Sequence, residues 1–199
     1  MIRRVLTNPY LTLVSRLVLG GIFFLAGLTK LGVPAAFRAS INSYEMPLPA
    51  ELVQAMAVWL PPLELGVGLW ILVGLFTRFA AALSSGLMIV FLVALVQAMA
   101  RGLSPDCGCF SGPDGNPIGL AVLNALGPVG SFLTTGQVGP ATIIRDLTFL
   151  AMGVHLMVVP TVFGIDNLRR RGTVETADAG VEEPAAQPAP EMVSSEIRL

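Results

Sequence analysis

Four long apolar runs constrain this chain more than any other feature of its sequence. They cover residues 10–31, 53–76, 79–100 and 143–163. A bilayer core of about 30 Å needs roughly 20 apolar residues per helical crossing, so each run is long enough to span it. Lipid offers no hydrogen-bond partners to the backbone, which favours helices in such segments. The sequence therefore predicts an all-α integral membrane four-helix bundle.

The domain organisation follows from the positions of these runs. Residues 1–165 are predicted to form one membrane domain whose first crossing is retained, because its apolar stretch is far longer than the roughly 7–15 residues of a signal-peptide core. Residues 166–199 contain several prolines and acidic residues and little apolar mass. This segment is predicted to be a disordered cytoplasmic tail.

Composition identifies the solvent of this protein and excludes one class of partner. Of all residues, 54% are hydrophobic and 13% are charged, whereas soluble domains carry about 25% charged residues. The lipid bilayer is therefore the expected environment. The net charge is -1 and the basic residues are scattered, so no basic stripe is present to bind a nucleic acid.

The segments between the spans also carry signals. Pro61-Pro62 predicts a kink inside the second span, because each proline removes a backbone hydrogen bond. Thr77-Arg78 is a short connection, which predicts an antiparallel hairpin of spans two and three. A helical turn is expected at 35–43. The apolar stretch 118–133 is too short to span and is expected to lie in the interface or pack on the mouth of the bundle.

Basic residues at the span ends predict the orientation. Four crossings put both termini on one side, and the positive-inside rule assigns that side to the cytoplasm if it carries more Lys and Arg. One side has Arg3, Arg4, Arg78, Arg169, Arg170 and Arg171, and the other has Lys30, Arg38, Arg101 and Arg145. Both termini are thus predicted to be cytoplasmic in the inner (plasma) membrane, with Cys107 and Cys109 on the periplasmic or outer side.

The pair Cys107-Gly108-Cys109 is the candidate catalytic site. A disulfide between these cysteines closes a small ring of unusual geometry, which makes it readily reduced and suited to electron exchange. An oxidising outer compartment would permit that use. A structural clip or two unpaired thiols are the alternatives. A metal site that recruits Asp106 or His155 is disfavoured, because catalytic zinc uses three protein ligands and His155 lies deep in span four.

Ionisable residues within the spans are candidates for a quinone site or a proton relay. Glu64 and His155 are both expected near mid-membrane, where such residues are costly unless they have partners. A structural clasp of Glu64 with His155 or Arg16 is the competing interpretation. Gln97 is a third candidate quinone contact, although an interhelical hydrogen bond also explains it. The Arg145-Asp146 pair opens span four, where the acid complements the helix dipole and Arg145 is expected to extend outward.

Several sequence blocks resemble one membrane protein family, the DoxX-like and MauE family. The resemblance covers residues 14–160, and the order and spacing of the blocks carry it. The blocks are Arg16-Leu-Val-Leu-Gly-Gly-Ile-Phe-Phe-Leu-Ala-Gly-Leu-Thr-Lys30-Leu, Leu60-Pro-Pro-Leu-Glu64-Leu-Gly-Val-Gly-Leu, Gly74-Leu-Phe-Thr-Arg78, Arg101-Gly-Leu and Cys107-Gly-Cys-Phe110. The chain departs from the family pattern in having Ser111 before Gly112 and a longer stretch from 112 to 142.

The resemblance implies a four-helix membrane bundle associated with thiol redox work. MauE proteins are linked to maturation of methylamine dehydrogenase beside a thioredoxin-like partner, and DoxX proteins to oxidative-stress and quinone-related complexes. Carried over to this chain, it makes Cys107 and Cys109 the redox pair. The resemblance also identifies four polar positions of the family that have no assigned role, and these are Arg16, Lys30, Glu64 and Arg78.

These observations favour a membrane component of thiol-disulfide exchange. Cys107 and Cys109 are expected to exchange disulfides with a thioredoxin-like protein at the outer face, with quinone as a potential electron acceptor. One cysteine pair is half of what a self-sufficient membrane oxidase uses, so the chain is expected to be a subunit of a membrane complex. The alternative is a non-enzymatic assembly or anchoring subunit with a static clip. A transporter is disfavoured because no internal repeat is visible.

Overall fold

A computed structural model describes residues 8–103, 114–130 and 139–159 of the chain. All regular structure in these residues is α-helical, and four of the helices are long and apolar enough to cross a membrane. Those four are α2 (Pro9–Lys30), α4 (Ala50–Val73), α5 (Thr77–Ala100) and α8 (Pro140–Val158). Two short helices are α3 (Pro34–Asn42) and α6 (Pro117–Ala125). The predicted all-α membrane fold is confirmed, whereas the predicted tail, residues 166–199, lies outside the described residues.

Local sequence signals set the ends of these helices. The side chain of Asn8 caps α2 by accepting from the backbone of Tyr10 at 3.0 Å. Proline stands in the first turn of α2, α3, α6 and α8, where its missing N–H costs nothing. Gly74 ends α4 with a φ of 75°, a left-handed conformation that glycine adopts without strain. The next helix begins at Thr77, so α4 and α5 form the expected hairpin.

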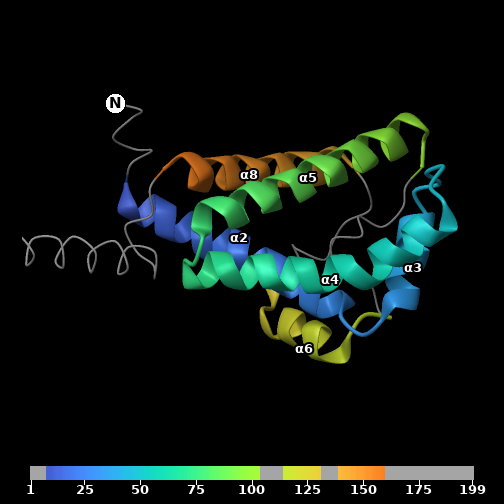
Figure 1. The fold of residues 1–199 in the computed structure, drawn as a ribbon, viewed down its shortest axis with the longest axis horizontal. Helices are drawn as coiled ribbons and strands as arrows, with labels where there is room; N and C mark the ends of the chain where they lie inside the picture. The colour runs from blue at the N-terminus through green and yellow to red at the C-terminus, as the bar shows by residue number, and fades with distance from the viewer. Residues whose placement is uncertain (1–7, 104–113, 131–138, 160–199) are drawn as a thin grey trace, which may run out of the picture. The chain divides into compact units, whose positions relative to one another are not determined.

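The long helices pack mainly as two pairs, α2 on α4 and α5 on α8 (Figure 1). Small residues allow the first pair to approach closely. A Cβ at Gly27 would lie 2.5 Å from the backbone nitrogen of Leu65, and one at Gly68 would collide with the backbone of Phe24. Membrane helices use small residues in this way because lipid provides no hydrophobic drive toward association.

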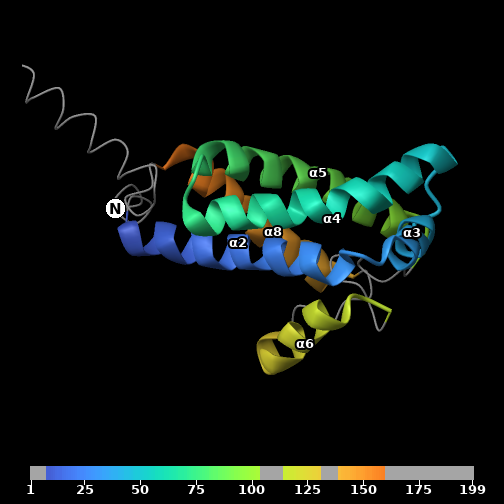
Figure 2. The same ribbon diagram turned by 60° about the horizontal axis from the view of Figure 1, so that its bottom comes forward.

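Helix α4 continues through Pro61 and Pro62. Figure 2 shows that the helix changes direction part-way along its length. This agrees with the expected kink, since two backbone donors are missing there. The bend accompanies a change of partner: Val53 and Ala57 pack on α3, whereas Val67 and Ile71 belong to the central core of the bundle.

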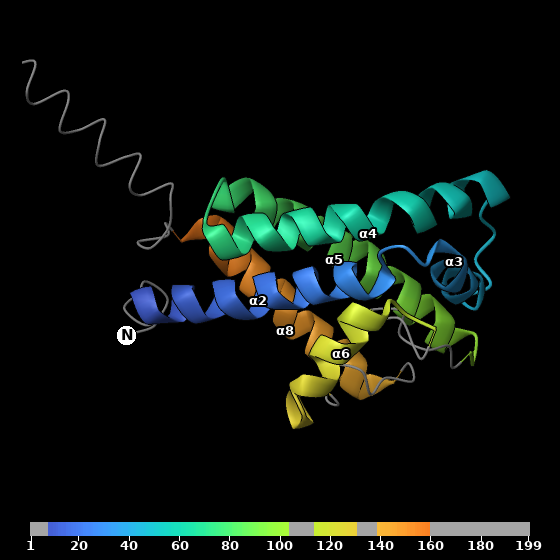
Figure 3. The same cartoon turned by 90° about the horizontal axis from the view of Figure 1, so that it is seen from below.

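The short helices pack at the end of the bundle where α2 stops. α3 packs on α4 through Phe37 and Ile41. α6 lies against α2 (Figure 3), with Gly119 so close that an added Cβ would be 2.7 Å from the Cα of Thr29. The apolar stretch after the cysteines therefore forms a short helix that packs on the bundle, one of the two arrangements expected for it.

Many large apolar side chains of the long helices face outward. Trp59 of α4, Val90 of α5 and Ile144 of α8 are 73%, 64% and 66% exposed. Apolar surface of this extent is costly in water, but it matches the interior of a bilayer. The helices thus form a multi-pass membrane domain whose outer surface contacts lipid.

Candidate functional site

A cavity of about 520 Å³ lies in the half of the bundle where α2 ends and α4 begins. Its wall is formed by α2, α3, α4, α5 and α8, together with the connection that contains Tyr44. Within the described residues the wall is almost entirely apolar, and its ionisable side chains there are Lys30, Glu64, Arg145, Asp146 and Tyr44. A largely apolar cavity with a few convergent polar groups is the usual form of a small-molecule site.

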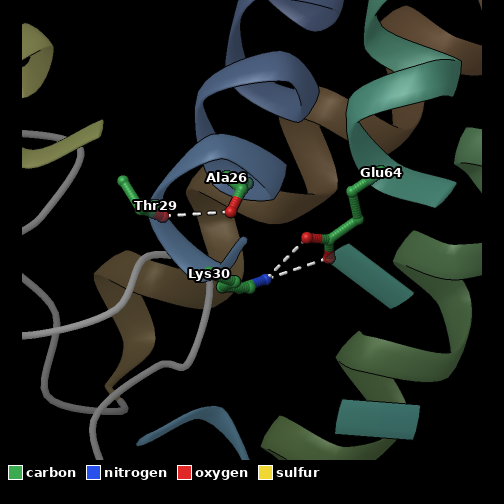
Figure 4. Close-up of polar contacts among 4 residues, drawn as sticks. All are labelled: Ala26, Thr29, Lys30 and Glu64. Carbon is green, nitrogen blue, oxygen red and sulfur yellow. Dashed lines mark hydrogen bonds and ion pairs between the residues drawn. The ribbon is translucent and has the colours of Figure 1, made fainter. Parts of the chain in front are cut away.

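Lys30 and Glu64 form an ion pair on this wall. The Nζ atom of Lys30 lies 2.9 Å from both carboxylate oxygens of Glu64 (Figure 4). The two side chains are 3% and 14% exposed. The same Nζ atom also lies 4.7 Å from the centre of the Phe37 ring, which adds a cation–π attraction. Lys30 is therefore held by partners on two other helices, α3 and α4.

Arg145 and Asp146 form a second ion pair on the wall. The Nε atom of Arg145 donates to the Oδ1 atom of Asp146 at 3.1 Å, and the side chains are 7% and 0% exposed. The expectation that Arg145 extends outward is wrong. Its guanidinium faces the interior because a buried carboxylate beside it supplies the partner that a buried cation requires.

The charges of the two pairs cancel, so the described residues of the cavity wall have no net charge. Lys30 and Arg145 contribute two positive charges, and Glu64 and Asp146 contribute two negative charges. Each charge is close to an opposite one, so the cost of burial in a low-dielectric environment is partly offset. The wall thus presents hydrogen-bonding groups to the cavity without a strong electric field of one sign.

Arg16 has a different role at the far end of the bundle. Its Nε atom donates to the carbonyl of Ile71 at 3.1 Å, and its Nη2 atom donates to the carbonyl of Leu72 at 3.0 Å. These carbonyls belong to the last turn of α4, where the helix itself provides no donors. Arg16 therefore satisfies the C-terminal end of α4 and also complements its dipole.

Comparison with known proteins assigns the family. Residues 8–159 match the family described as methylamine utilisation protein MauE. This chain belongs to the MauE family. The MauE side of the resemblance is thereby confirmed, whereas its DoxX-like side stays a prediction.

Two MauE relatives share much of the chain. A methylamine utilization protein MauE of Methylophilus methylotrophus is 30% identical over 159 residues, which cover 76% of this chain and 83% of the relative. The MauE protein of Paracoccus denitrificans is 29% identical over 151 residues, which cover 75% and 81%. No solved structure matches the chain.

The structure of this MauE protein brings together only part of the site expected from its sequence. Glu64 lines the cavity, but its partner is Lys30, so the expected clasp with His155 or Arg16 is wrong. Neither His155 nor Gln97 is among the described residues that line the cavity. The Nε2 atom of His155 is buried and has no hydrogen-bond partner in the described part of the chain.

Sequence reasoning did not find the partner of Glu64 or the second ion pair. The sequence marks Lys30 as a basic residue at a span end and as a family polar position without an assigned role, and it marks Arg145-Asp146 as a helix-end pair. The cost of burying a charge in lipid was an available signal. Lys30 stands at the end of one apolar run and Glu64 lies inside another, and charges in such places need opposite charges nearby. Two acids and two bases on three spans at similar depth could have been matched on that basis.

The candidate redox pair, Cys107 and Cys109, lies outside the described residues, as does Asp106. The chain on either side of this segment is firmly attached to the cavity end of the bundle. Arg101 donates to the backbone carbonyl of Glu45 at 2.7 Å. Asn116 donates from its backbone to the carbonyl of Thr29 at 2.7 Å and from its side chain to that of Leu31 at 2.8 Å.

Proposed function

We propose that this chain is a membrane component of thiol-disulfide exchange that helps to mature an exported protein of the methylamine dehydrogenase type. Cys107 and Cys109 are the reacting groups, and a thioredoxin-like protein at the outer face is the partner. The single observation that carries the proposal is membership of the MauE family together with a Cys-Gly-Cys pair. A related role in the response to oxidative stress uses the same chemistry.

The chemistry is a pair of exchange steps. A thiolate of the partner attacks one sulfur of a Cys107–Cys109 disulfide and releases the other sulfur as a thiolate, which forms a mixed disulfide. A second partner thiolate then attacks the mixed disulfide and releases the reduced pair. The partner loses two electrons and two protons, and the pair gains them. To act again, the pair must pass both electrons and protons to an acceptor, for which a quinone is the proposed class.

The position of the flanking residues supports this proposal. The chain leaves the described part at Leu103 and re-enters it at Asp114, and both sides are attached where α2 ends. Charge counting assigns this end of the bundle to the outer face. A reactive disulfide at that face could meet an exported partner and would also lie at the same end of the bundle as the cavity.

Thiol trapping in cells tests the proposal. A membrane-impermeant maleimide is applied before and after mild reduction, and the disulfide content of the methylamine dehydrogenase small subunit is measured in parallel. We expect the pair to cycle between both states, and Cys107→Ser with Cys109→Ser to lower the client's disulfide content severalfold. Ser111→Ala in the same segment is the matched control and should have no effect.

The opposite outcome has a definite meaning. If the pair stays oxidised throughout and the double serine variant leaves the client's disulfides unchanged, thiol exchange is rejected. The chain would then be a non-enzymatic assembly or anchoring subunit whose cysteines form a static clip.

A further inference from the structure

We propose that the cavity binds a neutral, lipid-soluble carbonyl compound of the quinone class, with its head against the Lys30–Glu64 and Arg145–Asp146 pairs and its tail directed into the bilayer between α4 and α5. The choice of a quinone rests on the proposed function, which needs a two-electron acceptor. The existence and chemistry of the binding site rest on the cavity alone.

The size of the cavity suits such a molecule. Its volume of about 520 Å³ lies within the range of about 300–1,000 Å³ that small-molecule sites occupy. Among the described residues that line it, only Tyr44, Ser40 and the two ion pairs are polar. A ligand that is mostly hydrocarbon with one compact polar group therefore fits this wall better than a sugar, a nucleotide or a peptide.

The cavity opens toward lipid. Several lining side chains of α4 and α5 are also exposed on the outer surface of the bundle, by between 46% and 64%, and these are Leu52, Ile89, Val90 and Val93. They mark a mouth between the two helices. Since the outer surface faces hydrocarbon, a ligand can enter from the bilayer without crossing water.

Packing explains why the mouth lies at this point. In its first half, α4 packs through Val53 and Ala57 on α3. The second half of α5 packs instead around Tyr44, through Leu92 and Leu95. Helices α4 and α5 thus belong to separate apolar clusters at the end of the bundle away from the turn that joins them. The space between these clusters is the cavity.

The charge of the wall selects the head group. A carboxylate or phosphate head would lose its hydration on entering the cavity, and two ion pairs whose charges already cancel do not offset that cost. A neutral carbonyl oxygen can instead accept a hydrogen bond from the Nζ atom of Lys30, which has three N–H groups, while the ion pair with Glu64 remains intact. Hydrogen bonds from charged donors are stronger than those between neutral groups.

The proposed site keeps one residue of the sequence prediction and replaces the others. Glu64 remains, while His155 and Gln97 do not line the cavity. Lys30, Arg145 and Asp146 take their place. A quinone site built on His155 or Gln97 would therefore be affected by different substitutions from those that affect this cavity.

Photolabelling of the full-length protein in lipid nanodiscs tests the proposal. The probe is an azido benzoquinone with a decyl tail, and the competitors are decylubiquinone and decanoate at matched mole fractions in the bilayer. We expect labelled peptides from 52–64 and 87–94, and competition by decylubiquinone at a concentration about tenfold lower than by decanoate, a difference of about 1.4 kcal/mol.

Two matched pairs of variants locate the site. Ala94→Phe fills the cavity from α5 and should lower labelling about tenfold, whereas Ala82→Phe adds the same atoms to an exposed position of α5 that does not line the cavity. Glu64→Gln changes the net charge of the wall to +1 and should make decanoate the stronger competitor by roughly fivefold. Gln54→Glu, an exposed position of α4, should leave the order of competitors unchanged.

Each contrary result overturns a defined part of the proposal. Equal loss in Ala94→Phe and Ala82→Phe, or no loss in either, rejects the cavity as the site. Equal competition by decanoate and decylubiquinone in the unaltered protein rejects a neutral head group and indicates a fatty acid site. Labelling that persists in Cys107→Ser with Cys109→Ser while client disulfides are unaffected would leave the cavity site standing and reject thiol exchange.

Discussion

The Nζ atom of Lys30 contacts both carboxylate oxygens of Glu64 at 2.9 Å, although the two residues are 34 positions apart and lie on different helices. This ion pair joins the end of α2 to the middle of α4 beside the cavity. A buried pair of this kind contributes less to stability than its short distance suggests, because both charges were removed from water. Loss of one partner alone has a far larger effect, since an uncompensated charge remains.

Removal of one charge should therefore cost more stability than removal of both. Lys30→Met or Glu64→Leu alone is expected to lower the free energy of unfolding by about 3–5 kcal/mol. The double variant should recover most of that loss, because two apolar side chains of similar length can pack there. Denaturant unfolding in mixed micelles measures the effect. Equal losses in the single and double variants would contradict this account of the pair.

The close approach of α2 and α4 predicts opposite effects for two glycines of one helix. Gly68→Ala should lower the stability of the protein by about 1–3 kcal/mol, because the added Cβ collides with the backbone of Phe24. Gly66→Ala should be neutral or stabilising by up to about 1 kcal/mol, since nothing lies within 4 Å of its added Cβ. Thermal melting in detergent distinguishes them. The prediction fails if both variants melt alike.

Asn116 is predicted to hold α6 against α2. Asn116→Ala removes the side-chain bond to the Leu31 carbonyl and the N-cap of α6, at a cost of about 0.5–2 kcal/mol. Faster hydrogen exchange in Pro117–Ala125, with little change in α4, is the expected result. Asn124→Ala, an exposed position of α6, is the matched control and should leave exchange at its original rate. Unchanged protection in Asn116→Ala would show that packing alone holds α6.

The orientation in the membrane is a prediction from charge and has a direct test. Alkaline phosphatase fused at Gly112 should be active and the same enzyme fused at Arg170 inactive, because it folds only on the outer side. The reverse pattern would put Cys107 and Cys109 in a reducing compartment and remove the basis for a disulfide there. An immunoblot checks that both fusions are expressed, so that lack of activity is not mistaken for lack of protein.

The sequence was sufficient to predict the four spans, because runs of about 20 apolar residues are typical of helices that cross a bilayer. It was also sufficient to select Glu64, since a carboxylate at that depth requires an explanation. The partner could not be found in the same way. The expected equal depth of Glu64 and His155 is wrong: Asp146, nine residues earlier on α8 and thus about 14 Å away along the axis, lines the cavity with Glu64. How the helices are shifted along one another depends on their packing, and that packing brings Lys30 rather than His155 to Glu64.

The inward orientation of Arg145 was hidden for a similar reason. At the start of a span, an arginine can reach the membrane surface or turn toward the protein interior, and the sequence permits both. The choice depends on whether a buried acceptor lies within reach. Asp146, the next residue, provides one. The start of α8 is buried by packing against other helices, and contacts between segments distant in the sequence carry no local signal.

The turn at 74–76 joins the two helix pairs and lies at the end of the bundle opposite to the cavity. Within one pair the backbones of α2 and α4 touch, which makes that pair stiff. Buried residues of α4 and α5 meet in one cluster near this turn, among them Ile71 and Ala80. The spacing of α4 and α5 is therefore fixed at the turn, and the width of the mouth is set at the opposite end, where the two helices belong to separate clusters.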